Sequence, residues 1–184
     1  MPVHVERRGR VEVITIDDVV PLVGENRVLA RLGLSELNER RNVGLRALID
    51  QAKLAGKQIT SGHVAFVLAP RLNAAGRIGE AEEALQLLQE SAPARAEKSA
   101  QKLEKLNNER RSMNNAVLED ALDRVKRECG YPDCSSILLW SEGWHAGVIG
   151  IVASRLVEEY QRPAVLVALT GDLGRGSGRS LPGL

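Results

Sequence analysis

The chain has 184 residues, and its formal net charge is +1, from 25 lysines and arginines against 24 aspartates and glutamates. Because no overall basic field surrounds such a chain, binding to nucleic acid has to depend on local arginines. Aromatic residues are only 3% of the total, which argues against a platform on which the bases of a single strand stack.

The two cysteines, Cys129 and Cys134, are too few for a disulfide framework. They also lack the second pair of ligands that a zinc site needs. The sequence therefore predicts a reduced, cytoplasmic location. The first residues are charged and contain no apolar signal core, and no apolar run approaches the roughly 20 residues that span a bilayer. We therefore expect a soluble protein with no membrane partner.

The first predicted element is a short β-strand over residues 11–16, where apolar and polar residues alternate. Asp17 and Asp18 follow it directly, and Pro21 blocks a regular helix there. Carboxylates just after a strand are a familiar position for metal ligands in an α/β sheet. An aspartate that caps the N-terminus of a helix is the alternative, and the sequence alone favours it.

Three helices are expected next. Apolar spacing predicts the first over residues 25–38 and the second over residues 45–54. Thr60 or Ser61 is expected to cap the third. His63 lies near the start of this helix, and we interpret it as a surface or capping residue rather than as a ligand.

The segment P-R-L-N-A-A-G-R, residues 70–77, is predicted to form an irregular loop, because it contains a proline, an asparagine and a glycine. Arg71 and Arg77 bracket this segment. Two arginines on a rigid loop suit contacts to phosphate groups. A pair of solvated surface arginines is the alternative.

A long amphipathic helix is expected over about residues 95–128, where glycine and proline are absent and apolar residues recur at helical spacing. A narrow apolar seam on so long a helix suits either a dimeric coiled coil or a bridge between two domains. We favour the bridge, because different α/β patterns flank the helix.

The C-terminal part predicts a strand, a helix and a second strand. Residues 137–140 are apolar throughout, as in a strand that is covered on both faces. In G-W-H-A-G-V-I-G-I-V-A-S-R-L, residues 143–156, a turn bracketed by glycines carries Trp144 and His145 into an apolar helix. The free N–H groups at a helix start suit an anion. Residues 164–169 predict a strand parallel to the first.

The sequence G-R-G-S-G-R-S, residues 174–180, is interpreted as a loop. Its glycines, arginines and serines are able to bring backbone amides, hydroxyls and guanidinium groups close to one phosphate. Together with the preceding helix start, this composition predicts a phosphate-binding α/β module. The sequence stops soon afterwards, at Leu184, without the compact finish of a complete domain.

Four motifs occur in order along the chain: T-I-D-D-V-V-P-L, P-R-L-N-A-A-G-R, G-W-H-A-G-V-I-G-I-V-A-S-R-L and G-S-G-R-S. In this order, with the long helix between the second and the third, they resemble the RecJ family of single-strand-specific 5′→3′ DNA exonucleases in the DHH phosphoesterase superfamily. The likeness covers nearly all of the chain from about Thr15 onward. It implies an α/β fold in three parts: the C-terminal part of a DHH catalytic domain (1–92), a connecting helix (93–130) and the N-terminal part of a DHHA1 domain (131–184).

The chain departs from the family's pattern at both ends. The usual catalytic motifs, D-Y-D-x-D-G and D-H-H, are absent, and residues 1–14 do not resemble the family's preceding segment. Asp18 matches the family's metal-binding carboxylate, while Asp17 replaces a small residue. The end of DHHA1 and the family's oligonucleotide-binding barrel are also absent. We therefore expect a fragment that is inactive by itself, in which the helices before Gly79 lack a covering sheet and leave apolar faces exposed.

The resemblance also implies roles for individual residues. Asp18 would be a ligand of Mn²⁺ or Mg²⁺, and His145 would be a catalytic residue beside the cleft on the DHHA1 side. The remaining implied residues bind the substrate, either its backbone or its 5′-terminal phosphate. They are Arg71, Asn73, Arg77, Ser177, Gly178 and Arg179.

The implied chemistry is hydrolysis of a phosphodiester by two metal ions, one of which activates water. The implied partners are single-stranded DNA with a 5′ phosphate and, in DNA repair and recombination, a single-stranded-DNA-binding protein or a helicase. Two alternatives stay open. One is a phosphodiesterase of short oligoribonucleotides or cyclic dinucleotides, whose DHHA1 domain typically carries a G-G-G-H type motif. The other is a residual nucleic-acid-binding module without catalysis.

Overall fold

The computed structural model describes residues 4–8, 11–15 and 21–183. Two short strands, β1 (His4–Arg8) and β2 (Val11–Thr15), pair as an antiparallel hairpin. The strand predicted over residues 11–16 is thus confirmed, whereas β1 was not predicted. Asp17 and Asp18, the candidate metal ligands or caps, lie outside the described residues.

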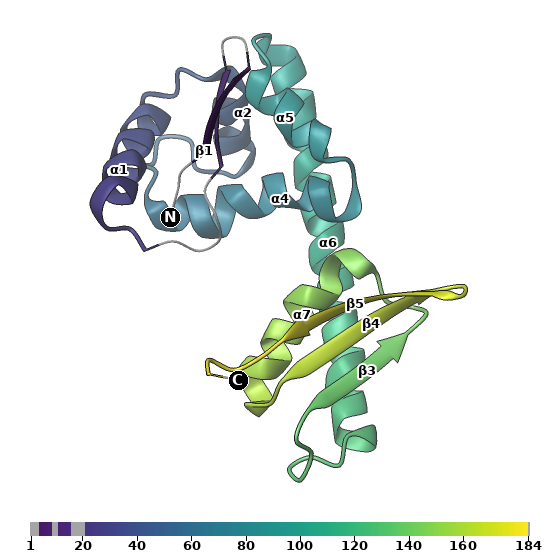
Figure 1. The fold of residues 1–184 in the computed structure, drawn as a ribbon. Helices are drawn as coiled ribbons and strands as arrows, with labels where there is room; N and C mark the ends of the chain where they lie inside the picture. The colour runs from purple at the N-terminus through teal and green to yellow at the C-terminus, as the bar shows by residue number, and fades with distance from the viewer. Residues whose placement is uncertain (1–3, 9–10, 16–20, 184) are drawn as a thin grey trace.

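A lobe of short helices follows, packed around one apolar core (Figure 1). Its elements are α1 (Gly24–Glu39), α2 (Val43–Gln51), α3 (Ser61–His63), the π-helical turn η1 (Val64–Leu68), α4 (Ala69–Ile78) and α5 (Ala81–Gln89). Thr60 caps α3, since its hydroxyl accepts from the His63 N–H while the His63 ring nitrogen Nδ1 accepts from the Thr60 N–H. His63 is therefore a capping residue, as its position indicated.

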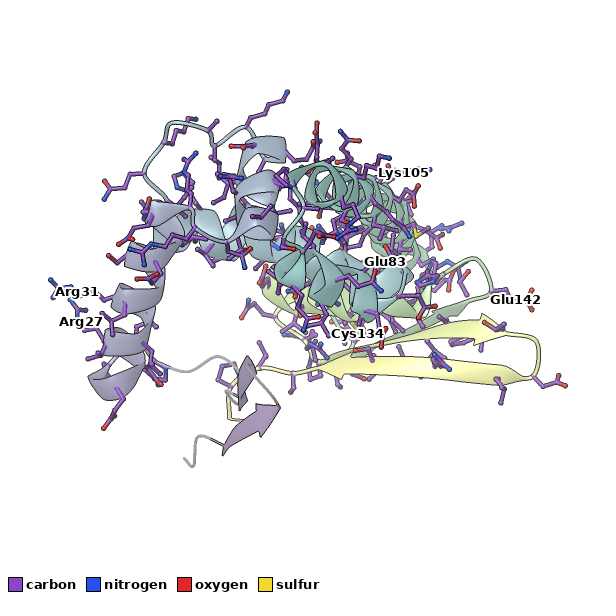
Figure 2. All side chains as sticks on the ribbon, turned by 90° about the horizontal axis from the view of Figure 1, so that it is seen from above. Arg27, Arg31, Glu83, Lys105, Cys134 and Glu142 are labelled. Carbon is purple, nitrogen blue, oxygen red and sulfur yellow. The ribbon has the colours of Figure 1, made fainter. Side chains whose placement is uncertain are left out.

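Helix α1 covers little of this core and has no buried residue. Val28 and Leu32 are 56% and 60% exposed. Arg27 and Arg31 project outward from the same helix (Figure 2). An apolar groove of about 710 Å³ opens between α1, α2 and the segment from α3 to α4. The exposed apolar faces expected for the helices before Gly79 are thus confirmed.

The irregular loop predicted over residues 70–77 is wrong, because this segment is helix α4. Pro70 lies in the first turn of α4, where a missing backbone N–H costs little. The turn η1 leads into it with a hydrogen bond from the Ala69 N–H to the Val64 carbonyl. Ala74 and Ala75 are fully buried, so packing against the neighbouring helices stabilises the helical form.

The long helix α6 (Pro93–Glu128) runs through both halves of the molecule (Figure 1). Ala96, Ala100 and Leu103 of its first half belong to the core of the helical lobe. Ala121 and Val125 of its second half belong to a separate core around a small sheet. The interpretation of this helix as a bridge is confirmed, because its apolar seam is used by two cores within one chain.

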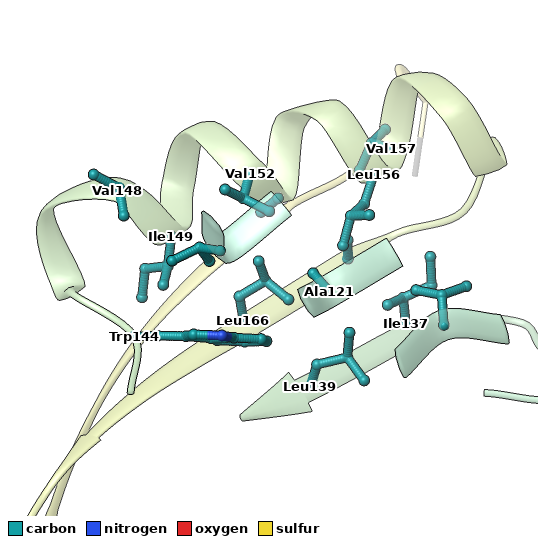
Figure 3. Packing of buried hydrophobic residues seen from close by; sticks show 14 of the residues in the cluster. Ala121, Ile137, Leu139, Trp144, Val148, Ile149, Val152, Leu156, Val157 and Leu166 are labelled. Atoms are coloured by element: carbon teal, nitrogen blue, oxygen red, sulfur yellow. The ribbon is translucent and has the colours of Figure 1, made fainter. Parts of the chain in front are cut away.

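The second core forms an α/β lobe with three strands and one further helix. Its elements are β3 (Ile137–Ser141), α7 (Ala146–Tyr160), β4 (Ala164–Thr170) and β5 (Leu173–Arg179). The strand order is β3-β4-β5, with β3 parallel to β4, as predicted, and β5 antiparallel to β4. Figure 3 shows the apolar side chains that fill the space between the helices and the sheet, among them Ala121, Leu139, Trp144, Val148, Ile149, Val152, Leu156 and Leu166.

Two expectations about this sheet are wrong. Strand β3 is covered on one face only, since Leu138 and Trp140 are 55% and 56% exposed while Ile137 and Leu139 are buried. Helices α6 and α7 pack on the same side of the sheet, so the other face stays open although it is apolar. A continuous apolar run does not by itself reveal which of its alternate side chains are covered.

The second correction concerns the predicted phosphate loop over residues 174–180, most of which is strand β5. Antiparallel pairing with β4 satisfies the backbone groups on one side of this edge strand and offsets the entropy that glycines lose in a strand. Cβ atoms added at Gly174 or Gly178 would meet side chains of β4, so these glycines face the open side of the sheet. Ser177 and Arg179, on the opposite face of the strand, lie against Gly150 of α7.

The fold class is confirmed as mixed α/β. The domain boundaries after residues 92 and 130 stay a prediction. In the part of the chain that the structure describes, no helix is long and apolar enough to cross a bilayer.

Candidate phosphate-binding site

The turn before α7 is held in place by α6. Trp144 is 6% exposed, and its indole Nε1 donates to Asp120 Oδ2 over 2.8 Å. Arg124 donates to the other oxygen of Asp120 over 3.0 Å and to the Trp140 carbonyl over 3.0 Å. Its guanidinium also lies 5.5 Å from the Trp144 ring centroid, which adds a cation–π contact. These contacts fix where α7 begins.

His145 is the N-cap of α7, and its ring nitrogen Nδ1 accepts from the Gly147 N–H over 3.0 Å. This bond uses Nδ1 as an acceptor, so the neutral ring carries its proton on Nε2. The ring is exposed. The contact that the structure gives His145 is therefore a capping bond, and its catalytic role stays a prediction.

Helices α4 and α7 approach each other closely where Arg77 meets Gly147. A Cβ atom on Gly147 would lie 2.1 Å from the Arg77 carbonyl oxygen, a distance that no side chain tolerates. The Arg77 guanidinium donates from Nη1 to the Gly147 carbonyl over 3.4 Å. A glycine at position 147 thus allows the end of α4 to bring Arg77 to the beginning of α7.

Strand β5 brings Ser177 and Arg179 to the same helix from the other side. A Cβ atom on Gly150 would lie 2.9 Å from Ser177 Oγ and 3.1 Å from Arg179 Nη2, so a larger residue there would displace these two side chains from their present positions. The two side chains also contact each other, because Arg179 Nη1 donates to Ser177 Oγ over 3.1 Å. Gly178 takes part through its backbone, since its carbonyl accepts from the same Nη1 over 2.7 Å.

An open pocket of about 490 Å³ lies where these elements meet. Its lining comes from α4, α7 and β5, and consists of Arg77, Gly150, Ile151, Ser154, Arg155, Glu158 and Arg179. Among the described residues, no ion pair joins Arg77, Arg155 or Arg179 to a carboxylate. Since three guanidinium groups outnumber one carboxylate, the pocket suits an anion with several oxygen acceptors.

Sequence reasoning missed Ser154 and Arg155. The signal was present, because residues 150, 151, 154, 155 and 158 recur at helical spacing on one face of α7. The opposite face is the buried one, with Val148, Val152 and Leu156 in the core. A search of the polar face of the predicted helix would have found this second arginine-bearing wall.

Arg71 and Asn73 do not line this pocket. The guanidinium of Arg71 forms a two-pronged ion pair with Glu104 of α6, and its Nη1 donates to the Val67 carbonyl over 2.6 Å. Its side chain is 14% exposed. Arg71 therefore holds α4 against α6. Asn73 is exposed on α4, and substrate contacts through these two residues stay predictions.

The described residues do not form a metal centre. They contain no group of three or more His, Cys, Asp or Glu side chains placed to hold an ion. Asp18, the implied ligand of Mn²⁺ or Mg²⁺, lies outside them. Anion binding is supported by the three guanidinium groups that line the pocket.

No protein-family model matches the chain. Three curated relatives share the name single-stranded-DNA-specific exonuclease RecJ. The protein of Bacillus subtilis is 41% identical over 174 residues, which are 92% of this chain and 22% of that protein. The protein of Thermus thermophilus is 40% identical over 181 residues, 98% of this chain and 25% of that protein. The protein of Escherichia coli is 33% identical over 174 residues, 92% of this chain and 30% of that protein.

Solved structures agree with these relatives. The chain superimposes on RecJ of Thermus thermophilus in complex with Mg²⁺ with a TM-score of 0.80 and 40% identity, over 91% of this chain and 25% of the other. An exonuclease RecJ bound to manganese gives a TM-score of 0.76 at 40% identity, over 91% of this chain and 40% of the other. The resemblance to RecJ is confirmed in sequence and in fold. The chain spans about a quarter of the length of the curated relatives.

Proposed function

We propose that this chain, a segment of RecJ type, binds the 5′-phosphorylated end of single-stranded DNA in the pocket between α4, α7 and β5. The observation that carries the proposal is the joint approach of Ser177 and Arg179 to Gly150, with Arg77 on the other wall. All the relatives reported above are named exonucleases specific for single-stranded DNA. That shared name disfavours the phosphodiesterase of oligoribonucleotides or cyclic dinucleotides.

The pocket offers a terminal phosphate complementary contacts. The planar guanidinium of Arg179 presents paired N–H donors, which match two oxygens of one phosphate. The Ser177 hydroxyl, which accepts from Arg179 in the free protein, is free to donate its own proton to a third oxygen. Arg77 and Arg155 add positive charge from two further directions. A terminal phosphate carries more charge than an internal diester, so such a pocket favours the end of a strand.

Cleavage requires more than these contacts. The RecJ structures contain Mg²⁺ or Mn²⁺, and such ions would activate water and stabilise the charge that develops on the phosphodiester. The described residues supply no cluster of ligands for them. We therefore assign binding of the 5′ end to this chain, and metal-dependent exonuclease activity to a RecJ-type protein of which it represents one part.

The test compares two oligothymidylates that differ only in a 5′ phosphate or a 5′ hydroxyl. One charge-assisted contact is worth roughly ten- to a hundred-fold in affinity, so Arg179→Ala should weaken binding of the phosphorylated strand by about that factor. Binding of the hydroxyl strand should hardly change. Fluorescence anisotropy at constant salt measures both.

Arg175→Ala is the matched control, because Arg175 is exposed on the same strand but does not line the pocket. It should leave the preference for the 5′ phosphate intact. If Arg179→Ala weakens both strands equally, Arg179 is only part of a basic surface and the proposal is wrong. Incubation of the same samples with Mn²⁺ should release no mononucleotides.

A further inference from the structure

The phosphate pocket also contains one carboxylate, that of Glu158. Gly150, Ser154 and Glu158 of α7 all line the pocket. Because they are spaced four residues apart, they follow one line along the surface of the helix. At a rise of about 1.5 Å per residue, this line is about 12 Å long. The pocket therefore has two ends along α7, which Gly150 and Glu158 mark.

The end at Gly150 carries the hydrogen-bond donors. Ser177 Oγ and Arg179 Nη2 lie closest to it, since a Cβ atom on Gly150 would be 2.9 Å and 3.1 Å from them. Arg77 reaches the same end from α4, and its Nη1 donates to the Gly147 carbonyl over 3.4 Å. In the described part of the chain, neither arginine is in an ion pair with a carboxylate, so this end presents two uncompensated positive charges.

Donors become fewer towards Glu158. The Ser154 hydroxyl donates its proton to the Gly150 carbonyl over 3.1 Å, so it has none left for an anion. Arg155 adds a positive charge, but Glu158 follows it by three residues and is its neighbour on the helix surface. Both side chains are exposed, and their opposite charges offset each other in the field that a ligand experiences. This end of the pocket is therefore close to neutral and contributes a carboxylate to the lining.

We propose that Glu158 is a specificity-determining residue, which restricts the pocket to a single terminal phosphate and disfavours a 5′ triphosphate. The proposal rests on the function proposed above. A terminal monophosphate carries about two negative charges at neutral pH, and these match the charges of Arg77 and Arg179. A triphosphate carries more negative charge than these two arginines compensate.

Packing determines in which direction a longer phosphate chain can extend. Helices α4 and α7 are in contact at Gly147, about one turn before Gly150, and the pocket does not continue past this contact. Strand β5 lies beside α7 (Figure 1) and closes the side on which Ser177 and Arg179 stand. A second and a third phosphate inside the pocket must therefore lie along α7 towards Glu158, whose carboxylate repels them. Phosphates that stay outside the pocket gain no new contacts in it.

This arrangement explains why a pocket for an anion contains a carboxylate. A pocket lined only by arginines would attract every polyanion, and most strongly the ligand with the most charge. Nucleoside triphosphates would then compete with the end of a strand. One carboxylate at the far end lowers their affinity, while the end at Gly150 keeps its two guanidinium groups. Specificity of this kind comes from repulsion of the wrong ligand.

The experiment compares two oligothymidylates of the same length, one with a 5′ monophosphate and one with a 5′ triphosphate. Fluorescence anisotropy is measured at constant salt and without divalent cations. The unmodified protein should bind the triphosphate strand no more tightly than the monophosphate strand. Glu158→Gln should raise the affinity for the triphosphate strand by about three- to tenfold more than that for the monophosphate strand, since the effect of an exposed charge is modest.

Glu159→Gln is the matched control, because Glu159 is the next residue of α7 and is exposed but does not line the pocket. It removes the same charge and should leave the ratio of the two affinities unchanged. Glu158→Lys should make the protein prefer the triphosphate strand, because it replaces repulsion by attraction. If Glu158→Gln raises both affinities equally, or changes neither, the proposal is wrong.

The outcome does not depend on the folding of the variants. If the unmodified protein itself binds the triphosphate strand more than about threefold more tightly than the monophosphate strand, Glu158 does not exclude triphosphates and the proposal is overturned. Agreement of the unmodified protein with the expected order supports it.

A third strand, with a 5′ hydroxyl, separates this proposal from the previous one. If the monophosphate strand binds more tightly than the hydroxyl strand and Arg179→Ala removes this advantage, the pocket stands, and the result at Glu158 decides the present proposal alone. If the monophosphate gives no advantage over the hydroxyl, the pocket assignment is wrong and both proposals fall.

Discussion

The two lobes of this chain differ in how completely their apolar side chains are covered. In the α/β lobe, the apolar face of α7 is buried, and Val148, Leu156 and Leu166 are fully inaccessible. In the helical lobe, Leu32 and Phe66 are 60% and 82% exposed. Helix α1 thus leaves apolar side chains uncovered while α7 buries its own, because a sheet lies beneath α7 and only a groove lies beside α1.

Most residues that line the pocket belong to the well-packed α/β lobe, and one, Arg77, belongs to the helical lobe. Ser177 and Arg179 stand on a strand and face a helix that is itself anchored to α6 through Trp144. Arg77 arrives from α4, across the contact at Gly147. A site on such packed elements holds its geometry better than a site on loops. Most residues of the binding pocket therefore stand on elements of the lobe whose core is well packed.

The largest expected effect comes from one pair of leucines. Leu166→Ala removes a fully buried side chain between α7 and the sheet, and should lower the free energy of unfolding by about 2–5 kcal/mol. Leu32→Ala removes a side chain that is 60% exposed, and should change it by less than about 0.5 kcal/mol. Urea unfolding followed by far-UV circular dichroism, to which the helices of both lobes contribute, measures both. Equal losses would mean that the two lobes are equally packed.

The next effect tests the contact between the lobes. Gly147→Ala places a Cβ atom against the Arg77 carbonyl and should destabilise the chain by about 1–3 kcal/mol, because α4 and α7 must separate. Gly33→Ala is the control in α1, where the added atom meets open space. It should stabilise by about 0.5–1 kcal/mol through helix propensity alone. If Gly147→Ala left the free energy of unfolding unchanged, α4 and α7 would be able to move apart without loss of stability.

The smallest expected effect is the contribution of Glu90, just before α6, to the stability of the chain at acidic pH. Glu90 accepts from Arg95 and from the Ala92 and Ser91 N–H groups, and these bonds lower its pKa to about 2. A lowered pKa contributes stability that is complete above the ordinary pKa of about 4.5 and is lost as pH falls through about 2. The stability difference between the unmodified protein and Glu90→Gln should therefore shrink over this range.

Thermal unfolding at several pH values between about 5 and 2 measures this difference. Arg95→Gln should give a pH dependence between those of the unmodified protein and Glu90→Gln, because Arg95 is the largest cause of the lowered pKa while the bonds from the Ala92 and Ser91 N–H groups remain. Parallel curves for the unmodified protein and both variants would contradict the assignment.

Local sequence patterns determined much of the helical structure. Apolar spacing predicted α1, α2 and the long α6, because an amphipathic face is a property of neighbouring residues. Side-chain type narrowed the cap of α3 to Thr60 or Ser61, and the structure shows that it is Thr60. Ordered motifs likewise indicated RecJ and pointed to Ser177 and Arg179, since a family's motif is readable without coordinates.

Tertiary structure decided where these patterns were ambiguous. Pro70 and Gly76 predicted a loop, yet α4 forms because Ala74 and Ala75 are buried against other helices. The glycines of β5 predicted a loop as well, yet pairing with β4 makes a strand and turns Arg179 towards α7. Backbone pairing and burial depend on segments far apart in the chain, which local composition does not encode.

The same reason explains the composition of the site. Arg71 and Arg77 stand on one helix and are equivalent by motif, but Glu104 of α6 neutralises the first and leaves the second beside Gly147. Arg155 enters the pocket because the other face of α7 is buried. The sequence by itself determined which residue types are present, and only the packing of α4, α6 and α7 decided which arginines remain available for a phosphate.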